Sequence, residues 1–160
     1  MIHRDMESLR SDWRDLATAT LRFMQADPEI RGAGYQVIVL ETLRDLDVQM
    51  AYAVRSRIKA RPGDGCNDLQ WVQRFFAKAK VGWFPTAEEN TRPSTWTLDS
   101  KHLDGLAFDA APSKDGVNPD WNAPDAVWER MASIAEANGI VPGRHLPDRK
   151  KDSPHFEARS

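Results

Sequence analysis

The segment SKHLDGLAFD, from Ser100 to Asp109, constrains this chain more than any other stretch. Its second half alternates, so a strand over residues 105–110 would turn Leu106 and Phe108 toward a core. The opposite face would then carry Asp109 between residues with very small side chains. We expect that face to have room for a metal ion and a substrate.

A second segment, DSPHFE from Asp152 to Glu157, supplies another histidine three residues after an acid. With His155 on a final strand over residues 155–157, its side chain would share a face with that of Glu157. Two histidines and one aspartate, here His102, Asp109 and His155, match a catalytic zinc site that keeps its fourth position for water. The acid Asp152 then remains available as a base.

Composition excludes some classes of protein. The chain has 160 residues, 41% of them hydrophobic, and a net charge of −2, which predicts a domain with a core and no nucleic-acid footprint. The N-terminus is charged and no apolar run resembles a signal or a membrane span, so we expect a cytoplasmic product without stable membrane association. The lone Cys66 and the histidines His3 and His145 receive no role.

The first part of the chain predicts a helix, a strand and a second helix. Apolar positions at steps of four and three predict a helix from Arg4 to Ala26, ended by Asp27 before a proline. A buried strand is predicted from Tyr35 to Leu40, and Asp45 can cap the next helix. The side chains expected on buried faces are Leu9, Trp13, Leu16, Thr20 and Phe23 in the first helix, and Leu46, Met50, Val54 and Ile58 in the second.

The remaining pattern predicts further short elements. Asn67 or Asp68 can cap a helix that ends near residue 81, and Pro124 can begin another that stops at Asn138-Gly139. We also expect an edge strand over residues 94–98. Loops are expected over residues 61–65, 88–93, 111–121 and 139–151. The aromatic side chains Trp71, Trp83 and Phe84 could form an exposed glycan-binding patch, but burial in the core is favoured.

The two motifs together resemble the zinc peptidases that cut bacterial cell-wall peptides. That family includes D-alanyl-D-alanine carboxypeptidases, vancomycin-resistance dipeptidases and phage L-alanyl-D-glutamate endopeptidases. The short form SKHLDGLAFDAAP and an Asp before PHFE are closest to the phage endolysin branch. The resemblance implies that His102, Asp109 and His155 bind one Zn²⁺ ion per chain and that Asp152 is the catalytic base.

The same resemblance implies roles for four further residues. Arg44 matches an arginine that follows the first strand and would hold a substrate carboxylate or the developing oxyanion, with Gln49 also in the substrate-binding pattern. Ser100 would contact the peptide or orient a metal ligand. Glu157 could support His155 or be a plain surface acid.

The chain departs from the family at two places. The segment over residues 139–146 stands where the family often has a tryptophan- and glycine-rich run, so part of the groove wall differs from the family pattern. The stretch from Ile58 to Ser94 is longer than in compact members and could be a lid or a wall-binding patch.

These observations predict an α+β fold, with helices packed on a small, mostly antiparallel sheet that carries zinc, as in the hedgehog and D-Ala-D-Ala peptidase fold. Residues 1–160 would form a single catalytic domain without a separate wall-binding domain. The resemblance implies an endolysin, which we expect to be monomeric, that hydrolyses the L-Ala–D-Glu bond of peptidoglycan stem peptides during phage lysis. It would leave the host cytoplasm after a holin partner permeabilises the membrane. The alternatives are a D-Ala-D-Ala carboxypeptidase or dipeptidase, and a zinc-stabilised peptidoglycan-binding module without turnover.

Overall fold

A four-stranded antiparallel sheet forms the centre of the chain. The computed structural model describes residues 3–61, 63–91, 100–147 and 151–159, so the edge strand expected over residues 94–98 lies outside the described part. The strands are β1 (Gln36–Glu41), β2 (Ala107–Ser113), β3 (Ile140–Pro142) and β4 (His155–Ala158). Their order is β1-β2-β4-β3, and every neighbouring pair is antiparallel. The predicted α+β fold is confirmed.

Two expected loops contain strand. Strand β2 continues to Ser113, where a loop was expected from residue 111, because residues 110–113 pair with β1. The expected loop over residues 139–151 contains β3 and a short 3₁₀ turn, η3 (Gly143–His145). A strand of three residues is too short for its alternation of buried and exposed side chains to be recognised in the sequence.

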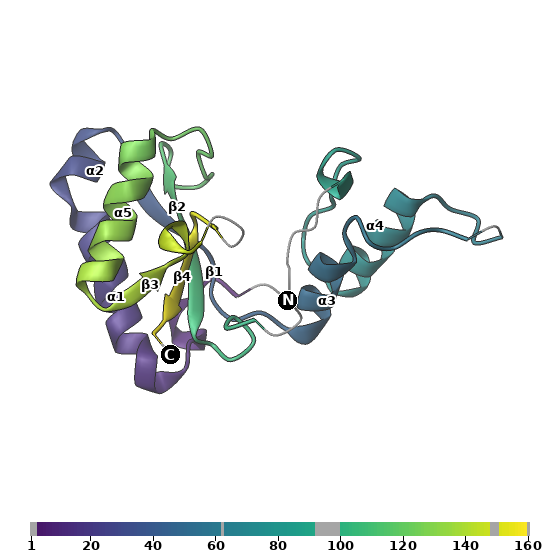
Figure 1. The fold of residues 1–160 in the computed structure, drawn as a ribbon, viewed down its shortest axis with the longest axis horizontal. Coiled ribbons are helices and arrows are strands. Elements are labelled where there is room, and N and C mark those ends of the chain that lie inside the picture. The colour runs from purple at the N-terminus through teal and green to yellow at the C-terminus, as the bar shows by residue number, and fades with distance from the viewer. Residues whose placement is uncertain (1–2, 62, 92–99, 148–150, 160) are drawn as a thin grey trace.

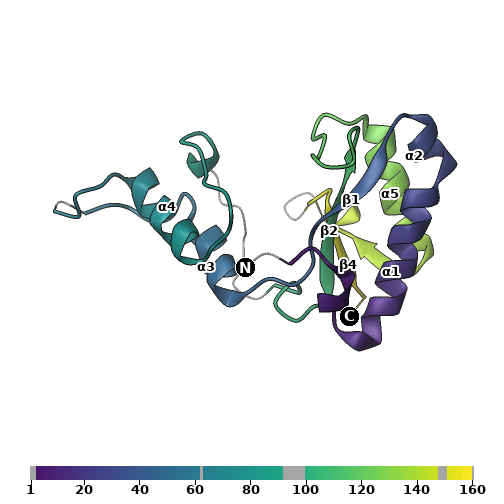
Figure 2. The same cartoon turned by 180° about the vertical axis from the view of Figure 1, so that it is seen from behind.

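Three helices cover one face of the sheet. These are α1 (Ser11–Ala26), α2 (Pro28–Gly32) and α5 (Asp125–Ala137), and both ribbon views place them on the same side (Figures 1 and 2). The sheet contributes Phe108 and Phe156 to the buried core beneath them, as the alternation predicted. The opposite face of these two strands carries the partly exposed polar side chains Asp109, His155 and Glu157.

The first helix differs from its prediction in both start and face. A 3₁₀ turn, η1 (Met6–Ser8), precedes α1, which begins at Ser11. Leu16 and Phe23 were expected in the core but are 42% and 56% exposed. The spacing of apolar residues shows that they share one face of the helix. Packing of α1 against the sheet and α5 decides which face is buried. The side chains that α1 buries are Trp13, Ala17, Thr20, Leu21 and Met24.

The residue Asp27 ends one helix and begins another. Its carboxylate accepts hydrogen bonds from the backbone N–H groups of Glu29 and Ile30, and Pro28 occupies the first turn of α2. This is an ordinary N-terminal cap. The sequence-based prediction had assigned Asp27-Pro28 only the role of a helix end.

A helical hairpin stands apart from the sheet. Helices α3 (Leu46–Val54) and α4 (Asp68–Lys78), with the segments that join and follow them to residue 91, form what we call the α3–α4 lobe (Figure 1). Asn67 caps α4 in a capping box with Gln70, as its sequence suggested. The lobe has its own apolar cluster, centred on the buried side chains Val48, Ala51, Tyr52, Val72 and Phe76.

Several apolar side chains of this lobe contradict their predicted burial. Leu46 and Met50 are 58% and 44% exposed, because α3 turns the other side of its surface toward α4. Trp83 and Phe84, favoured as core residues, are 37% and 56% exposed, while Trp71 is half-buried.

Among the described residues, we find no helix whose length and apolar character would suit a membrane span. The assignment of residues 1–160 to one catalytic domain stays a prediction.

Candidate active site

Three predicted metal ligands meet on the open face of the sheet. Asp109 on β2 is the direct register partner of His155 on β4, and His102 reaches them from the turn that precedes β2. His102 Nε2 lies 3.1 Å from Asp109 Oδ1 and 3.1 Å from His155 Nδ1, and the third side of this triangle is 3.2 Å. Three ligands about 2.0–2.1 Å from a tetrahedral zinc ion would be about 3.3 Å apart. The cluster therefore has the spacing of a metal site.

The other ring nitrogen of each histidine has an acceptor. His102 Nδ1 lies 2.9 Å from the carbonyl oxygen of Thr42, and His155 Nε2 lies 3.0 Å from Glu157 Oε2. Because these oxygens can only accept, they favour protons on those two nitrogens and leave His102 Nε2 and His155 Nδ1 as metal ligands. The donor set thus fits a bound zinc ion, with Glu157 supporting His155.

Charge is concentrated at this cluster. Burial opposes ionisation of Asp109, but His102 and His155 outweigh it and hold the pKa of the Asp109 carboxyl well below its usual range. Burial likewise opposes protonation of His155, yet its hydrogen bonds with Asp109 and Glu157 raise the pKa of that ring to about 10. A metal ion that binds here would displace the His155 proton.

The acid Asp152 borders the same space. Its side chain is solvent-accessible and lines the groove with His102, Asp109 and His155. Partial desolvation, followed by the negative charge of Asp109, raises the pKa of the Asp152 carboxyl. Its backbone N–H donates to the carbonyl of Gly143 over 3.1 Å, and a Cβ at Gly143 would overlap the Asp152 carbonyl oxygen. The glycine therefore allows the close turn that holds Asp152 at the site.

Arg44 is held rigidly at the edge of the cluster. Its Nε donates to Glu41 Oε1 over 2.9 Å and its Nη1 to Gln49 Oε1 over 2.7 Å, while its guanidinium lies 4.8 Å from the centre of the Tyr52 ring. Its Nη2 lies 3.9 Å from Asp109 Oδ2. Arg44 and Glu41 are both buried, so the guanidinium borders the groove in a fixed position and is balanced by the Glu41 carboxylate.

A β-bulge helps to build this arrangement. The register between β1 and β2 shifts between Val39 and Glu41, which brings Glu41 opposite Asp109. Such bulges redirect side chains at sheet edges and sites. Glu41, Thr42 and Tyr52 were not singled out from the sequence; an acid three residues before Arg44 was the available signal for Glu41.

The two remaining predicted residues take different places. Ser100 lines the groove, and its Oγ lies 3.4 Å from the backbone nitrogen of His102, at the long end for a hydrogen bond. Gln49 is fully buried on α3, and it contacts the Arg44 guanidinium. Direct contact of either residue with a substrate stays a prediction.

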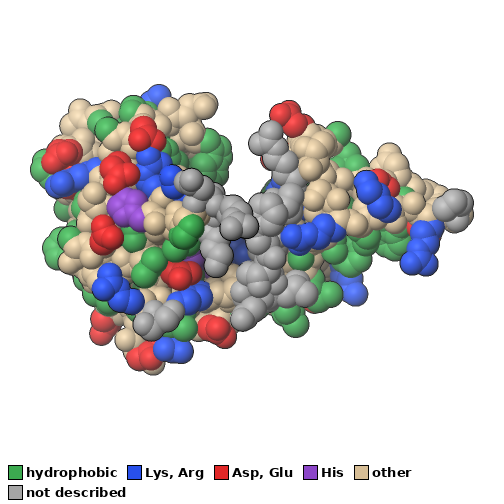
Figure 3. Space-filling model, in the orientation of Figure 1, with side chains coloured by type: hydrophobic (Ala, Val, Ile, Leu, Met, Phe, Trp, Pro, Cys, Tyr) green, Lys and Arg blue, Asp and Glu red, His purple; other side chains and the backbone are tan. Residues whose placement is uncertain are grey.

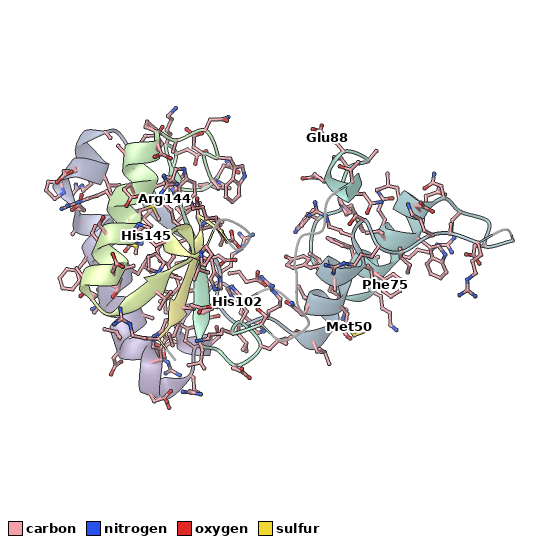
Figure 4. The ribbon with its side chains drawn as sticks, in the orientation of Figure 1. Met50, Phe75, Glu88, His102, Arg144 and His145 are labelled. Atoms are coloured by element: carbon pink, nitrogen blue, oxygen red, sulfur yellow. The ribbon has the colours of Figure 1, made fainter. Side chains whose placement is uncertain are left out.

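The metal ligands lie in a large groove of about 1510 Å³, which we call the site groove. One wall comes from the α3–α4 lobe through Tyr52 and Trp83, and another from the loop between β2 and α5 through Val117 and Trp121. Figure 4 places His102 on the side of the sheet that faces α3 and α4. The site groove is open to solvent.

Comparison with known proteins gives structural likeness without close sequence similarity. No protein-family model matches the chain, and no curated protein matches it. Among solved structures, it is similar to the L-Ala D-Glu endopeptidase ChiX of Serratia marcescens, with 20% identity, a TM-score of 0.49 and coverage of 96% of this chain and 83% of that one.

Two further structures are similar to the same degree. One is the vancomycin resistance D,D-pentapeptidase VanY, a mutant in complex with Zn(II), with 18% identity, a TM-score of 0.49 and coverage of 99% and 79% of the two chains. The other is VanYB in complex with D-alanine-D-alanine, with 19% identity, a TM-score of 0.48 and coverage of 100% and 77%. These names fall within the group of enzymes that the sequence motifs resemble, and none of the three is named as a phage endolysin. The functional argument below rests on the geometry of the site.

Proposed function

We propose that the chain is a zinc-dependent peptidase that hydrolyses the L-Ala–D-Glu bond of peptidoglycan stem peptides. One observation carries the proposal: three ligand atoms form a triangle with sides of 3.1–3.2 Å, on the wall of a groove that also presents an acid and a fixed arginine. A site that only stabilises the fold has no use for an open groove or an accessible acid.

Zinc would be held by His102, Asp109 and His155, and when bound it supplies Lewis acidity and activation of water near neutral pH. The carboxylate of Asp152 accepts the proton of the attacking water and delivers it to the leaving amine. Its exposure to the site groove gives it access to both positions.

Arg44 would bind a carboxylate of the stem peptide or the oxyanion that develops at the scissile carbonyl. Its buried contacts with Glu41 and Gln49 fix the guanidinium before substrate arrives, which reduces the reorganisation needed in the transition state. Gln49 would then act through Arg44. Ser100 would support the turn that carries His102.

The L-Ala–D-Glu bond, rather than D-Ala-D-Ala, is supported by the short motif form and by the presence of Asp before PHFE. The setting in phage lysis, with release from the host cytoplasm by a holin, is proposed on the same resemblance. A monomer is proposed as well.

Mass spectrometry of purified peptidoglycan, digested with the zinc-loaded protein beside a chelated control, tests the proposal. We expect released peptides that begin at D-Glu, and none in the control. Release of terminal D-Ala alone would instead identify a D,D-carboxypeptidase. An absence of products with zinc bound would indicate a binding module.

Two variants test the role of Asp152. Asp152→Asn should retain zinc and lose hydrolysis, since a carboxamide cannot accept the proton. Asp104→Asn is the matched control, because Asp104 is an exposed acid that lines the same groove and has no role in the proposed mechanism. Equal activity of both variants would remove Asp152 from the mechanism.

A further inference from the structure

One exposed tryptophan borders the site groove without a part in the chemistry above. Trp121 is 59% exposed, and it lines the groove from the loop between β2 and α5. Its ring lies parallel to the buried ring of Trp128, at 7° and a centroid separation of 6.2 Å. Trp128 therefore supports the indole from inside the fold, while more than half of the Trp121 surface stays accessible.

The loop that carries Trp121 is tightly organised. Asp115 Oδ1 accepts hydrogen bonds from Ser113 Oγ and from the backbone N–H groups of Val117 and Asn118. Asp120 binds Lys114 through an ion pair of 3.0 Å and receives the Tyr35 hydroxyl hydrogen bond. Because these contacts fix the backbone of the loop, they reduce the ordering cost of presenting Trp121 to a ligand.

The volume of the site groove exceeds that of a typical small-molecule site. Sites for small molecules enclose about 300–1,000 Å³, and this groove is about 1510 Å³. Figure 3 shows hydrophobic side chains at the edge of the body formed by the sheet and its helices, on the side toward the α3–α4 lobe. The additional space has an apolar rim made partly by Val117, which is 73% exposed, and Trp121.

We infer that Trp121 is a stacking platform for a hexosamine ring of the glycan strand, so that the site groove takes glycan-linked stem peptides in preference to free ones. The inference rests on the proposed peptidase function. Stem peptides offer small methyl groups, carboxylates and amines, whereas the flat C–H face of a pyranose ring matches the exposed indole in shape and polarity.

The chemistry of the substrate supports this assignment. The L-alanine of a stem peptide is attached directly to the muramic acid, and one residue spans at most about 3.6 Å. The sugar ring, which is joined to this residue through the lactyl group, therefore lies close enough to reach the groove when the L-Ala–D-Glu bond is at the metal site. For cleavage at D-Ala-D-Ala, four residues would separate the sugar from the scissile bond, or roughly 14 Å when extended.

Two matched substrates test the platform: a disaccharide-linked stem peptide and the same peptide with an N-acetyl group in place of the sugar. For Trp121→Ala, we expect kcat/KM on the glycan-linked substrate to fall about tenfold, through KM, because half of a large aromatic surface loses its partner. The loss of kcat/KM on the free peptide should be much smaller, because that substrate has no sugar ring to stack on the indole. Trp121→Phe should recover most of the loss.

Phe23→Ala is the matched control, because Phe23 is 56% exposed on α1 and does not line the groove. An equal effect of Trp121→Ala on both substrates, or an effect on neither, would overturn the inference.

A titration of the unaltered protein keeps the test independent of variant folding. Addition of the free disaccharide should shift the NMR signal of the Trp121 indole N–H, assigned through Trp121→Phe, more than those of the other tryptophans. An unshifted signal at millimolar disaccharide would contradict the platform. Failure of the unaltered protein to hydrolyse either substrate would reject the proposed function, while this titration still decides on glycan binding.

Discussion

His102 Nε2 and His155 Nδ1 lie 3.1 Å apart, although 53 positions separate these residues in the chain. Each ring is oriented by an acceptor behind it, the Thr42 carbonyl for His102 and the Glu157 carboxylate for His155. The ligand atoms are therefore positioned by strand pairing and by these two hydrogen bonds. This explains how two histidines from separate sequence motifs meet at one site.

The Glu157 carboxylate should strengthen zinc binding through His155. We expect Glu157→Gln to lower zinc affinity by roughly 10–100-fold, because an amide is a weaker acceptor and holds the imidazole tautomer less firmly. Competition with a zinc-binding dye would measure the change. Glu88→Gln, at an exposed acid of the α3–α4 lobe, should leave the affinity unaltered. Equal affinities would show that Glu157 is a surface acid.

The buried pair of Glu41 and Arg44 should matter for stability as well as for the site. The Arg44 and Glu41 side chains are only 8% and 7% exposed, so Glu41→Gln leaves a desolvated guanidinium without its balancing charge. We expect the free energy of unfolding to fall by about 3 kcal/mol in urea titrations. The exposed pair of Arg14 and Glu7 supplies the control, and Glu7→Gln should cost less than about 1 kcal/mol. Similar losses would contradict the distinction.

One hydroxyl in the core has no partner among the described residues. Thr20 Oγ1 lies on the buried face of α1, and it forms no hydrogen bond with the described residues. Thr20→Val keeps the shape and removes the unsatisfied group, so we expect the protein to be stabilised by about 1 kcal/mol in thermal unfolding. Thr20→Ser, which keeps the hydroxyl and loses the methyl group, should destabilise it. A destabilising Thr20→Val would show that the hydroxyl has a bonding partner.

The pair of Asp27 and Arg130 should make stability depend on acid pH. The hydrogen bond from Arg130, acting against burial, lowers the pKa of Asp27 from its usual value. The folded chain therefore binds this proton less readily than the unfolded chain, so the contribution is present above about pH 4 and is lost as pH falls through the lowered pKa.

Asp27→Asn isolates that charge, because asparagine can still cap α2. We expect the variant to be about 1 kcal/mol less stable at pH 7, with the difference closing below about pH 4. Chemical unfolding at several pH values measures it. A difference that stays constant with pH would assign the effect to packing.

The buried and open faces of the two ligand-bearing strands could be predicted from sequence. Alternation at Phe108 and Asp109, and at His155 and Phe156, is a local property of extended chain, and the structure buries both phenylalanines while the polar partners stay on the open face. The capping box at Asn67 was equally local. Residue type and a spacing of two or three positions carry such signals.

Other features were decided by tertiary structure alone. Exposed Phe23 and Met50 show that a helical repeat defines a stripe while the neighbouring elements select the one that is buried. The bulge that sets Glu41 opposite Asp109, and the parallel stacking of Trp121 on Trp128, depend on strand register and on a loop closing over a helix. The sequence by itself determined which side chains could bind metal and which faces could be buried. Only the folded sheet brings the metal ligands together. The free energy for this comes from burial of apolar surface between segments that are distant in the sequence.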